Sequence, residues 1–91
     1  MNFANLLNHL MLSYNVHKRL LCFKTRIGKP TINRYLRGET VPNDENVRLI
    51  AEAFWSYSDK SQNPHELKLL LFLIKKMIQF DKTKKVEPDD G

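Results

Sequence analysis

Apolar residues recur at three- and four-residue steps along most of the chain, which is the spacing of amphipathic helices. The first stripe predicts a helix over residues 3–14 and consists of Phe3, Leu6, Leu7, Leu10 and Met11. Asn15 is then a candidate cap for a second helix, over roughly residues 16–25. Its expected inward residues are Val16, Leu20, Leu21 and Phe23.

Glycine and proline mark the start and the end of the next segments. Gly28 interrupts the pattern, and Pro30 follows where the first turn of a helix tolerates a missing N–H. A short third stripe comprises Ile32, Tyr35 and Leu36 and stops at Gly38. After a loop over residues 39–43, Asn43 or Asp44 is expected to cap a fourth helix, whose apolar face is Val47, Ile50, Ala51 and Phe54.

The fifth predicted helix is the longest and covers residues 64–80. It follows a polar loop over residues 56–62 and begins with a cap, a proline and an acid, Asn63-Pro64-His65-Glu66. Residues 81–91 have little to bury, so we expect a flexible tail there. The sequence therefore predicts one all-α domain over residues 1–80 with five helices and a long C-terminal helix.

Composition agrees with one small, soluble helical domain. The chain has 91 residues and is poor in glycine and proline, which disfavours a sheet. The longest apolar run, residues 69–74, is too short to span a bilayer, and the N-terminus lacks the features of a signal peptide. A single cysteine, Cys22, excludes an internal disulfide and suits a cytoplasmic location.

The position of the charges is more informative than their sum of +5. Up to Gly38 the chain has seven basic residues and no acidic one: Lys18, Arg19, Lys24, Arg26, Lys29, Arg34 and Arg37. Such a one-sign stretch is either a solvated surface or the footprint of a polyanion. The rest of the chain mixes acids with lysines.

Two short helices joined by a tight turn, the second of them basic, are typical of a DNA-reading helix-turn-helix. The segment LLCFKTRIGKPTINRYLRGETVP resembles the lambda-repressor/Cro-like, XRE-type helix-turn-helix family, with the motif over about residues 16–37. Leu21 and Cys22 stand where the family has a buried Leu-Ala-type pair, and Ile27, Ile32 and Gly38 match its turn and reading helix. The following VRLIAEAF resembles the family's fourth helix.

The resemblance implies contacts with double-stranded DNA. By position, the base contacts would come from Lys29, Pro30, Arg34, Thr31 and Asn33, with Arg34 able to bond guanine O6 and N7 together. The phosphate contacts would come from Lys18, Gly28, Arg37 and Thr40. Gly28 would offer an N–H at a helix N-terminus, a favourable place for an anion.

Two positions depart from the family pattern. Arg26 replaces the usual turn glycine, and if this residue is left-handed the side chain costs on the order of 1 kcal/mol. Thr25 stands at a usually apolar position. Both departures indicate a slightly altered turn.

Other candidate residues have simpler interpretations. Cys22 is expected to be a small buried thiol, and Tyr35 and Trp55 are expected to pack in or beside the core. His9, His17 and His65 have no partners at metal-ligand spacing, and no catalytic arrangement or cofactor motif is evident. We therefore expect neither an enzyme nor a cofactor or small-molecule substrate.

The predicted helix over residues 64–80 is apolar on two faces. One stripe consists of Leu67, Leu70, Leu71, Ile74, Met77 and Ile78, and the second consists of Leu69, Phe72, Leu73 and Phe80. The second stripe is either buried by the domain itself or free to form a homodimer, which would let two reading helices meet successive major grooves. We expect the homodimer.

The sequence thus predicts a sequence-specific transcriptional regulator, with repression by promoter occupancy as the simplest mechanism. An alternative is a protein-interaction module, such as an antitoxin-like partner that uses the C-terminal helix. The basic N-terminal stretch favours the DNA-binding interpretation.

Overall fold

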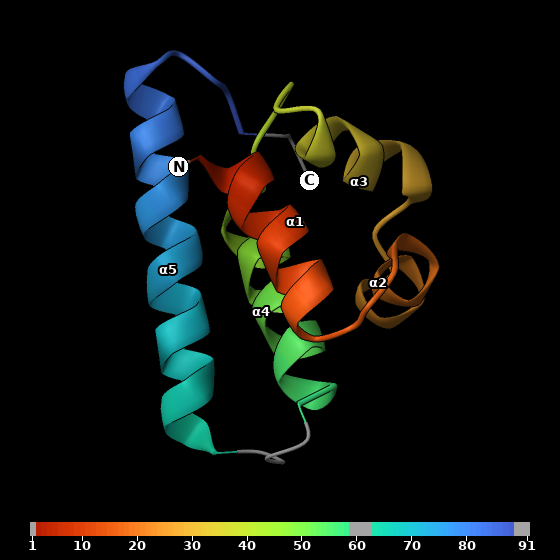
Figure 1. Ribbon diagram of the computed structural model, residues 1–91. Coiled ribbons are helices and arrows are strands. Elements are labelled where there is room, and N and C mark those ends of the chain that lie inside the picture. The colour runs from red at the N-terminus through yellow and green to blue at the C-terminus, as the bar shows by residue number, and fades with distance from the viewer. Residues whose placement is uncertain (1, 59–62, 89–91) are drawn as a thin grey trace.

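The computed structural model describes residues 2–58 and 63–88, and these form five helices (Figure 1). The helices are α1 (Phe3–Ser13), α2 (Lys18–Thr25), α3 (Lys29–Leu36), α4 (Asp44–Ser56) and α5 (Pro64–Thr83). The described residues contain no strand, only an isolated bridge between Val41 and Pro88. The predicted all-α class is confirmed. None of these helices is both long enough and apolar enough to cross a membrane.

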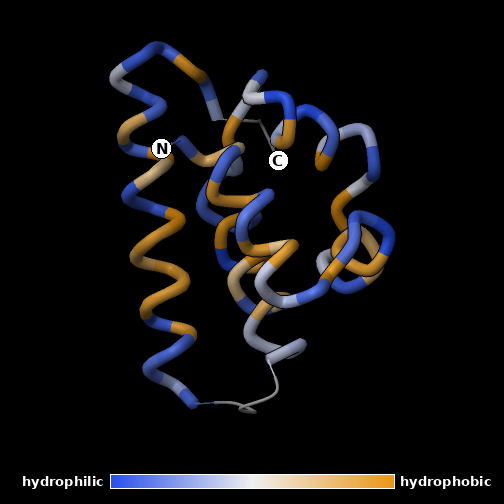
Figure 2. The backbone as a smooth tube through the Cα atoms, viewed as in Figure 1, coloured by the Kyte–Doolittle hydropathy of each residue, from blue (hydrophilic) through white to orange (hydrophobic). Residues whose placement is uncertain are grey.

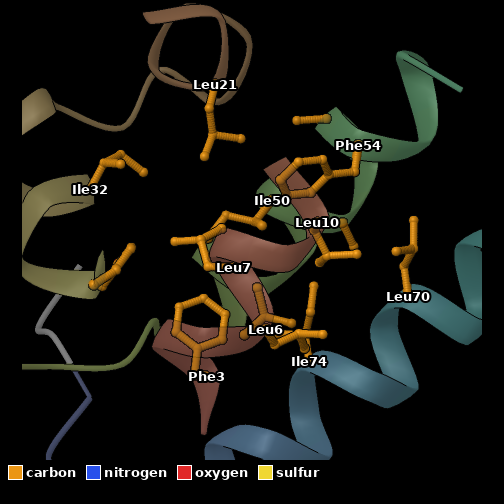
Figure 3. Packing of buried hydrophobic residues seen from close by; sticks show 14 of the residues in the cluster. Phe3, Leu6, Leu7, Leu10, Leu21, Ile32, Ile50, Phe54, Leu70 and Ile74 are labelled. Carbon is orange, nitrogen blue, oxygen red and sulfur yellow. The ribbon is translucent and has the colours of Figure 1, made fainter. Parts of the chain in front are cut away.

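Helices α1 and α4 form the middle of the molecule, with α5 on one side and the α2–α3 pair on the other (Figure 1). Every helix contributes to one hydrophobic core (Figure 3). The predicted stripe of α1 is the centre of this core, where the Phe3 ring meets the Tyr35 ring of α3 edge-on at 5.8 Å. Phe3 and Tyr35 are both fully buried, so the core ties the first helix directly to the third.

The junction between α1 and α2 corrects one prediction. Asn15 does not cap α2; it follows α1 in a left-handed conformation, with φ of 56°. Its N–H donates to Leu12 O, and the N–H of Val16 donates to Met11 O at 2.8 Å. This is a Schellman ending, for which asparagine is the best residue after glycine. Val16 belongs to this ending and is buried. Helix α2 begins after it, at Lys18, with His17 as its N-cap.

The predicted faces of the helices hold, with one exception. Asn43 and Asn63 cap α4 and α5 as expected. On α2, Leu21 is buried and Leu20 half-buried, but Phe23 is 80% exposed and does not point inward as predicted. The helix has only eight residues, and its buried side is already occupied by Leu21 and Thr25.

Helix α5 extends to Thr83, three residues beyond the predicted boundary at Phe80. Asp81 lies in this extension, and its buried carboxylate accepts the backbone N–H of Phe3 at 2.9 Å. A second Schellman ending follows at Lys85, with φ of 67°, where Val86 N donates to Asp81 O. Residues 81–88 therefore contact the domain through Asp81, Val86 and Glu87, while residues 82–85 are exposed, and the flexibility expected of this tail stays a prediction. Residues 89–91 of that expected tail, like residues 59–62 of the expected loop, lie outside the described residues.

Candidate nucleic-acid interface

The turn between α2 and α3 is built around the two residues that depart from the family pattern. Arg26 ends α2 in the left-handed conformation, with φ of 62° and ψ of 17°, and its N–H donates to Cys22 O at 2.9 Å. Thr25 is only 2% exposed. Its hydroxyl donates to Leu21 O at 2.7 Å and accepts the N–H of Ile27 at 3.1 Å. The threonine thus satisfies a buried turn donor that an apolar residue would leave without this partner.

Helix α3 is held by one face and presents the other. Ile32 and Tyr35 are fully buried, and Ile27 anchors the preceding turn. The Tyr35 hydroxyl also accepts the Asn46 side-chain amide at 3.0 Å, which ties α3 to α4. The opposite face carries the residues predicted to contact bases: Lys29, Pro30 and Arg34 are exposed, and Thr31 and Asn33 are half-exposed. The structure therefore brings all five together on one helix.

Arg34 is oriented by its own helix. One of its terminal nitrogens donates to the Thr31 hydroxyl at 3.2 Å, one turn earlier. The guanidinium remains exposed, so other N–H groups on it can reach an acceptor outside the protein. A guanidinium in this position is suited to a bidentate acceptor such as the edge of a guanine.

The N-termini of α2 and α3 lie beside a basic hollow. The hollow has a volume of about 550 Å³ and is lined by His17, Lys18, Arg19, Cys22 and Lys29. Lys18 and Lys29 were predicted DNA contacts, whereas sequence reasoning passed over Arg19 and His17. The one-sign charge pattern already contained Arg19, but only the packing of α2 against α3 places it beside Lys29.

The same two helix ends also lack side-chain caps. Asparagine side chains cap α1, α4 and α5, whereas His17 and Gly28 make no capping side-chain hydrogen bond to α2 and α3. Helix N-termini carry partial positive charge and unpaired N–H groups. The N-termini of α2 and α3 are therefore both suited to bind an anion, together with the lysines around them.

The loop after α3 differs from the hollow, because its two predicted phosphate contacts already have partners. Arg37 donates from Nε to the Glu39 carboxylate, and the two form an exposed ion pair. Thr40 donates its hydroxyl to Glu87 O at 2.7 Å. The hydrogen bond from Arg37 lowers the pKa of Glu39, and the same bond raises the pKa of Arg37. Glu39 is the first carboxylate in the chain, a signal that sequence reasoning noted without assigning it a role.

Helix α5, which carries the second stripe, lies on the other side of α1 and α4 from the α2–α3 pair (Figure 1). Figure 2 shows hydrophobic residues along most of the middle of α5. Phe72 is 59% exposed, Leu69 56% and Phe80 41%, while Leu73 is half-buried. The domain therefore does not bury this stripe by itself. Two lysines lie over its rings, Lys76 over Phe72 and Lys84 over Phe80.

The remaining candidates have structural roles. Tyr35 is a core residue, and the Trp55 indole donates to Asn63 O at 2.9 Å, so both pack as expected. Cys22 is half-buried against the core rather than fully buried. Within residues 2–58 and 63–88, no three His, Cys, Asp or Glu side chains are grouped so that they could hold a metal ion.

Comparison with known proteins identifies the family of the chain. A family model described as helix-turn-helix matches residues 6–54, more than half of the chain. The match runs from α1 to the end of the buried part of α4, and includes both helices beside the basic hollow. Searches of curated proteins and of solved structures gave no match.

Proposed function

The chain belongs to the XRE-type, lambda-repressor-like helix-turn-helix family of DNA-binding transcription regulators, and from this premise we propose that it is a repressor that binds a symmetric operator as a dimer. The observation that carries the proposal is the outward face of α3. It presents Lys29 and Arg34 on a helix whose other face is fixed by Ile32 and Tyr35 in the core. Repression by promoter occupancy requires no activity other than DNA binding.

In this proposal α3 enters the major groove. Arg34 pairs with guanine O6 and N7, an interaction worth about 1–3 kcal/mol of discrimination, and Lys29 contacts a neighbouring base. Thr31 keeps the Arg34 guanidinium over the bases through their hydrogen bond. Asn33 adds polar contacts to bases, and Pro30 adds apolar contact with a thymine methyl.

The phosphate contacts come first from the basic hollow. Lys18 and the N–H groups at the start of α2 bind one phosphate, and the N-terminus of α3 at Gly28 faces another. Affinity is therefore expected to fall steeply with salt. Arg37 and Thr40 are weaker candidates for phosphate contacts, because each already donates a hydrogen bond to an acceptor inside the protein, Glu39 and Glu87 O respectively.

The dimer is proposed to form through the exposed stripe of α5, made of Leu69, Phe72, Leu73 and Phe80. The position of α5 opposite α3 supports this arrangement (Figure 1). A dimer formed there would leave the α2–α3 pair of each copy free to contact DNA, as a two-fold symmetric operator requires.

Selection from a random duplex pool at near-physiological salt tests the proposed function. We expect an enriched two-fold symmetric site with half-sites about one helical turn apart. Retention without any enriched sequence would indicate sequence-independent binding and contradict the proposal. No retention at all would favour the protein-interaction alternative, with α5 as the surface to probe.

The dimer is tested separately by Phe72→Glu, which places a charge in the middle of the exposed stripe. The variant is expected to be a folded monomer by light scattering, with weak operator binding. Leu12→Glu is the matched control, because Leu12 is more exposed than Phe72 but lies on α1 outside the stripe. A Phe72→Glu variant that remains dimeric would refute the α5 interface while leaving the reading helix untouched.

A further inference from the structure

The end of α3 fixes Glu39 beside the reading face. Gly38 is left-handed, with φ of 74°, and its N–H donates to Tyr35 O at 3.1 Å. The N–H of Glu39 then donates to Arg34 O at 3.0 Å. These two bonds are a Schellman ending, so the position of Glu39 relative to the helix is set by backbone hydrogen bonds.

The Glu39 side chain returns toward the helix and engages Arg37. Arg37 is the C-cap of α3, and its Nε donates to Oε2 of Glu39. Both side chains are more than half exposed, so the pair lies at the surface. The positive charge of Arg34 also acts on Glu39, in the direction that keeps the carboxylate ionised. A negative group therefore lies among the arginines at the C-terminal end of the reading helix.

Thr40, the second predicted phosphate contact in this loop, also has an acceptor inside the protein. Its hydroxyl donates to Glu87 O, and the neighbouring N–H of Val41 donates to the same oxygen at 3.2 Å. The segment after α5 thus supplies an acceptor to this loop from the far end of the chain. Both side chains predicted to bind phosphate here donate a hydrogen bond inside the protein, in contrast to the basic hollow at the other end of α3.

We infer that Glu39 acts as an internal substitute for a DNA phosphate, which holds Arg37 and limits the sequence-independent affinity of the reading face for duplex DNA. The inference rests on the proposed use of α3 as the DNA-reading helix. A phosphate that binds the remaining N–H groups of Arg37 lies close to the Glu39 carboxylate, where like charges oppose it, and a phosphate that takes Nε must displace that carboxylate. Electrostatic attraction supplies nearly all non-specific binding, so Glu39 acts mainly on that part of the affinity.

The test measures the salt dependence of binding to a labelled random-sequence duplex of about 20 base pairs, between about 50 and 200 mM NaCl. Glu39→Gln keeps the shape of the side chain and removes its charge. One more phosphate neutralised by Arg37 would steepen the slope of log K against log salt by about 0.9. Relative to the unchanged protein, Glu39→Gln should therefore gain about 3.5-fold more affinity at 50 than at 200 mM salt.

Two further variants isolate the pair. Glu52→Gln makes the same charge change in another exposed ion pair, with Arg48 on α4, and is expected to leave the slope unchanged. Arg37→Gln should lower affinity less than about twofold in the native background, and should abolish the gain in the Glu39→Gln background.

Three results would overturn the inference. Equal steepening by Glu39→Gln and Glu52→Gln would mean that net charge alone is responsible. An Arg37→Gln loss that is the same in both backgrounds would mean that Glu39 does not restrain Arg37. Weaker binding by Glu39→Gln would mean that the carboxylate orients Arg37 toward DNA instead. Failure of the native protein to bind the duplex in a salt-dependent way would count against the proposed DNA interface itself, and is a separate result.

Discussion

The left-handed residue in the turn between α2 and α3 gives a quantitative prediction. Arg26 has φ of 62°, a conformation in which an L side chain costs about 1–2 kcal/mol and glycine costs none. Arg26→Gly removes this strain but adds about 0.4–1 kcal/mol of backbone entropy to the unfolded chain. The Arg26 side chain is exposed, so its loss removes little packing. We expect Arg26→Gly to raise the free energy of unfolding by about 0.5–1 kcal/mol.

Urea unfolding followed by circular dichroism measures this difference. For a domain of this size the slope is about 1 kcal/mol per molar urea, so the midpoint should rise by about 0.5–1 M. All variants must be compared at one protein concentration, because the proposed dimerisation would add to the apparent stability. Arg26→Ala is the control, since it removes the charge and the long side chain but retains the Cβ. It should unfold within about 0.5 kcal/mol of the native protein. If alanine stabilises as much as glycine, or if glycine does not stabilise at all, backbone strain at Arg26 is not the cause.

Three other predictions concern stability. Thr25→Val removes the acceptor for Ile27 N and should cost about 1–3 kcal/mol in the same urea assay, whereas Thr25→Ser should retain most of the stability. Asp81→Ala leaves the N–H of buried Phe3 without its acceptor and should also cost about 1–3 kcal/mol, while Asp81→Asn, which keeps an oxygen, should cost less; equal losses would argue against the hydrogen bond. Burial, together with the hydrogen bond to Glu66, raises the pKa of Tyr14 from 10.0 to about 12. Its stabilisation is complete below pH 10 and is lost as pH rises from 10 to 12, because the unfolded chain ionises first. The shift corresponds to at most about 2.7 kcal/mol, which solvent screening of the partly exposed phenol reduces to about 1 kcal/mol. The difference in stability between the native protein and Tyr14→Phe should shrink over this range, and a constant difference would contradict the assignment.

The sequence predicted the helices because their apolar spacing is strong and their starts carry ordinary caps. The predicted N-caps of α4 and α5, Asn43 and Asn63, are confirmed for this reason. Asn15 was misinterpreted because asparagine is favoured both at a helix N-cap and in the left-handed position that ends a helix. Only the buried Val16, which completes the ending of α1, distinguishes the two.

Long-range pairs were beyond prediction. Asp81 and Phe3 are 78 residues apart, and nothing near Asp81 in the sequence indicates that its carboxylate is buried. Lys85 ends α5 in a left-handed conformation without any sequence signal, since lysine has no preference for it. The end of α5 was therefore placed too early, and the segment after it was expected to be flexible.

The residues of the candidate site were predictable from the sequence, but their hydrogen-bond partners inside the protein were not. The resemblance placed the five candidate base contacts on one helix, and the structure shows them exposed or half-exposed there. It could not show that Arg37 and Thr40 already have acceptors, because Glu87 reaches Thr40 only through the packing of the segment after α5. No role was assigned to Glu39 from the sequence, because only the backbone ending at Gly38 places its carboxylate beside Arg37.

The central claim, that α3 reads bases through Arg34, is tested most directly by measuring Arg34→Gln against the selected site and a scrambled duplex of the same length. Loss of a bidentate guanine contact should lower affinity for the selected site by about tenfold or more, while affinity for the scrambled duplex changes little. The ratio of the two affinities should therefore fall about tenfold. An equal loss on both duplexes would mean that Arg34 binds only phosphate, and no loss on either would contradict the assignment of α3 as the reading helix.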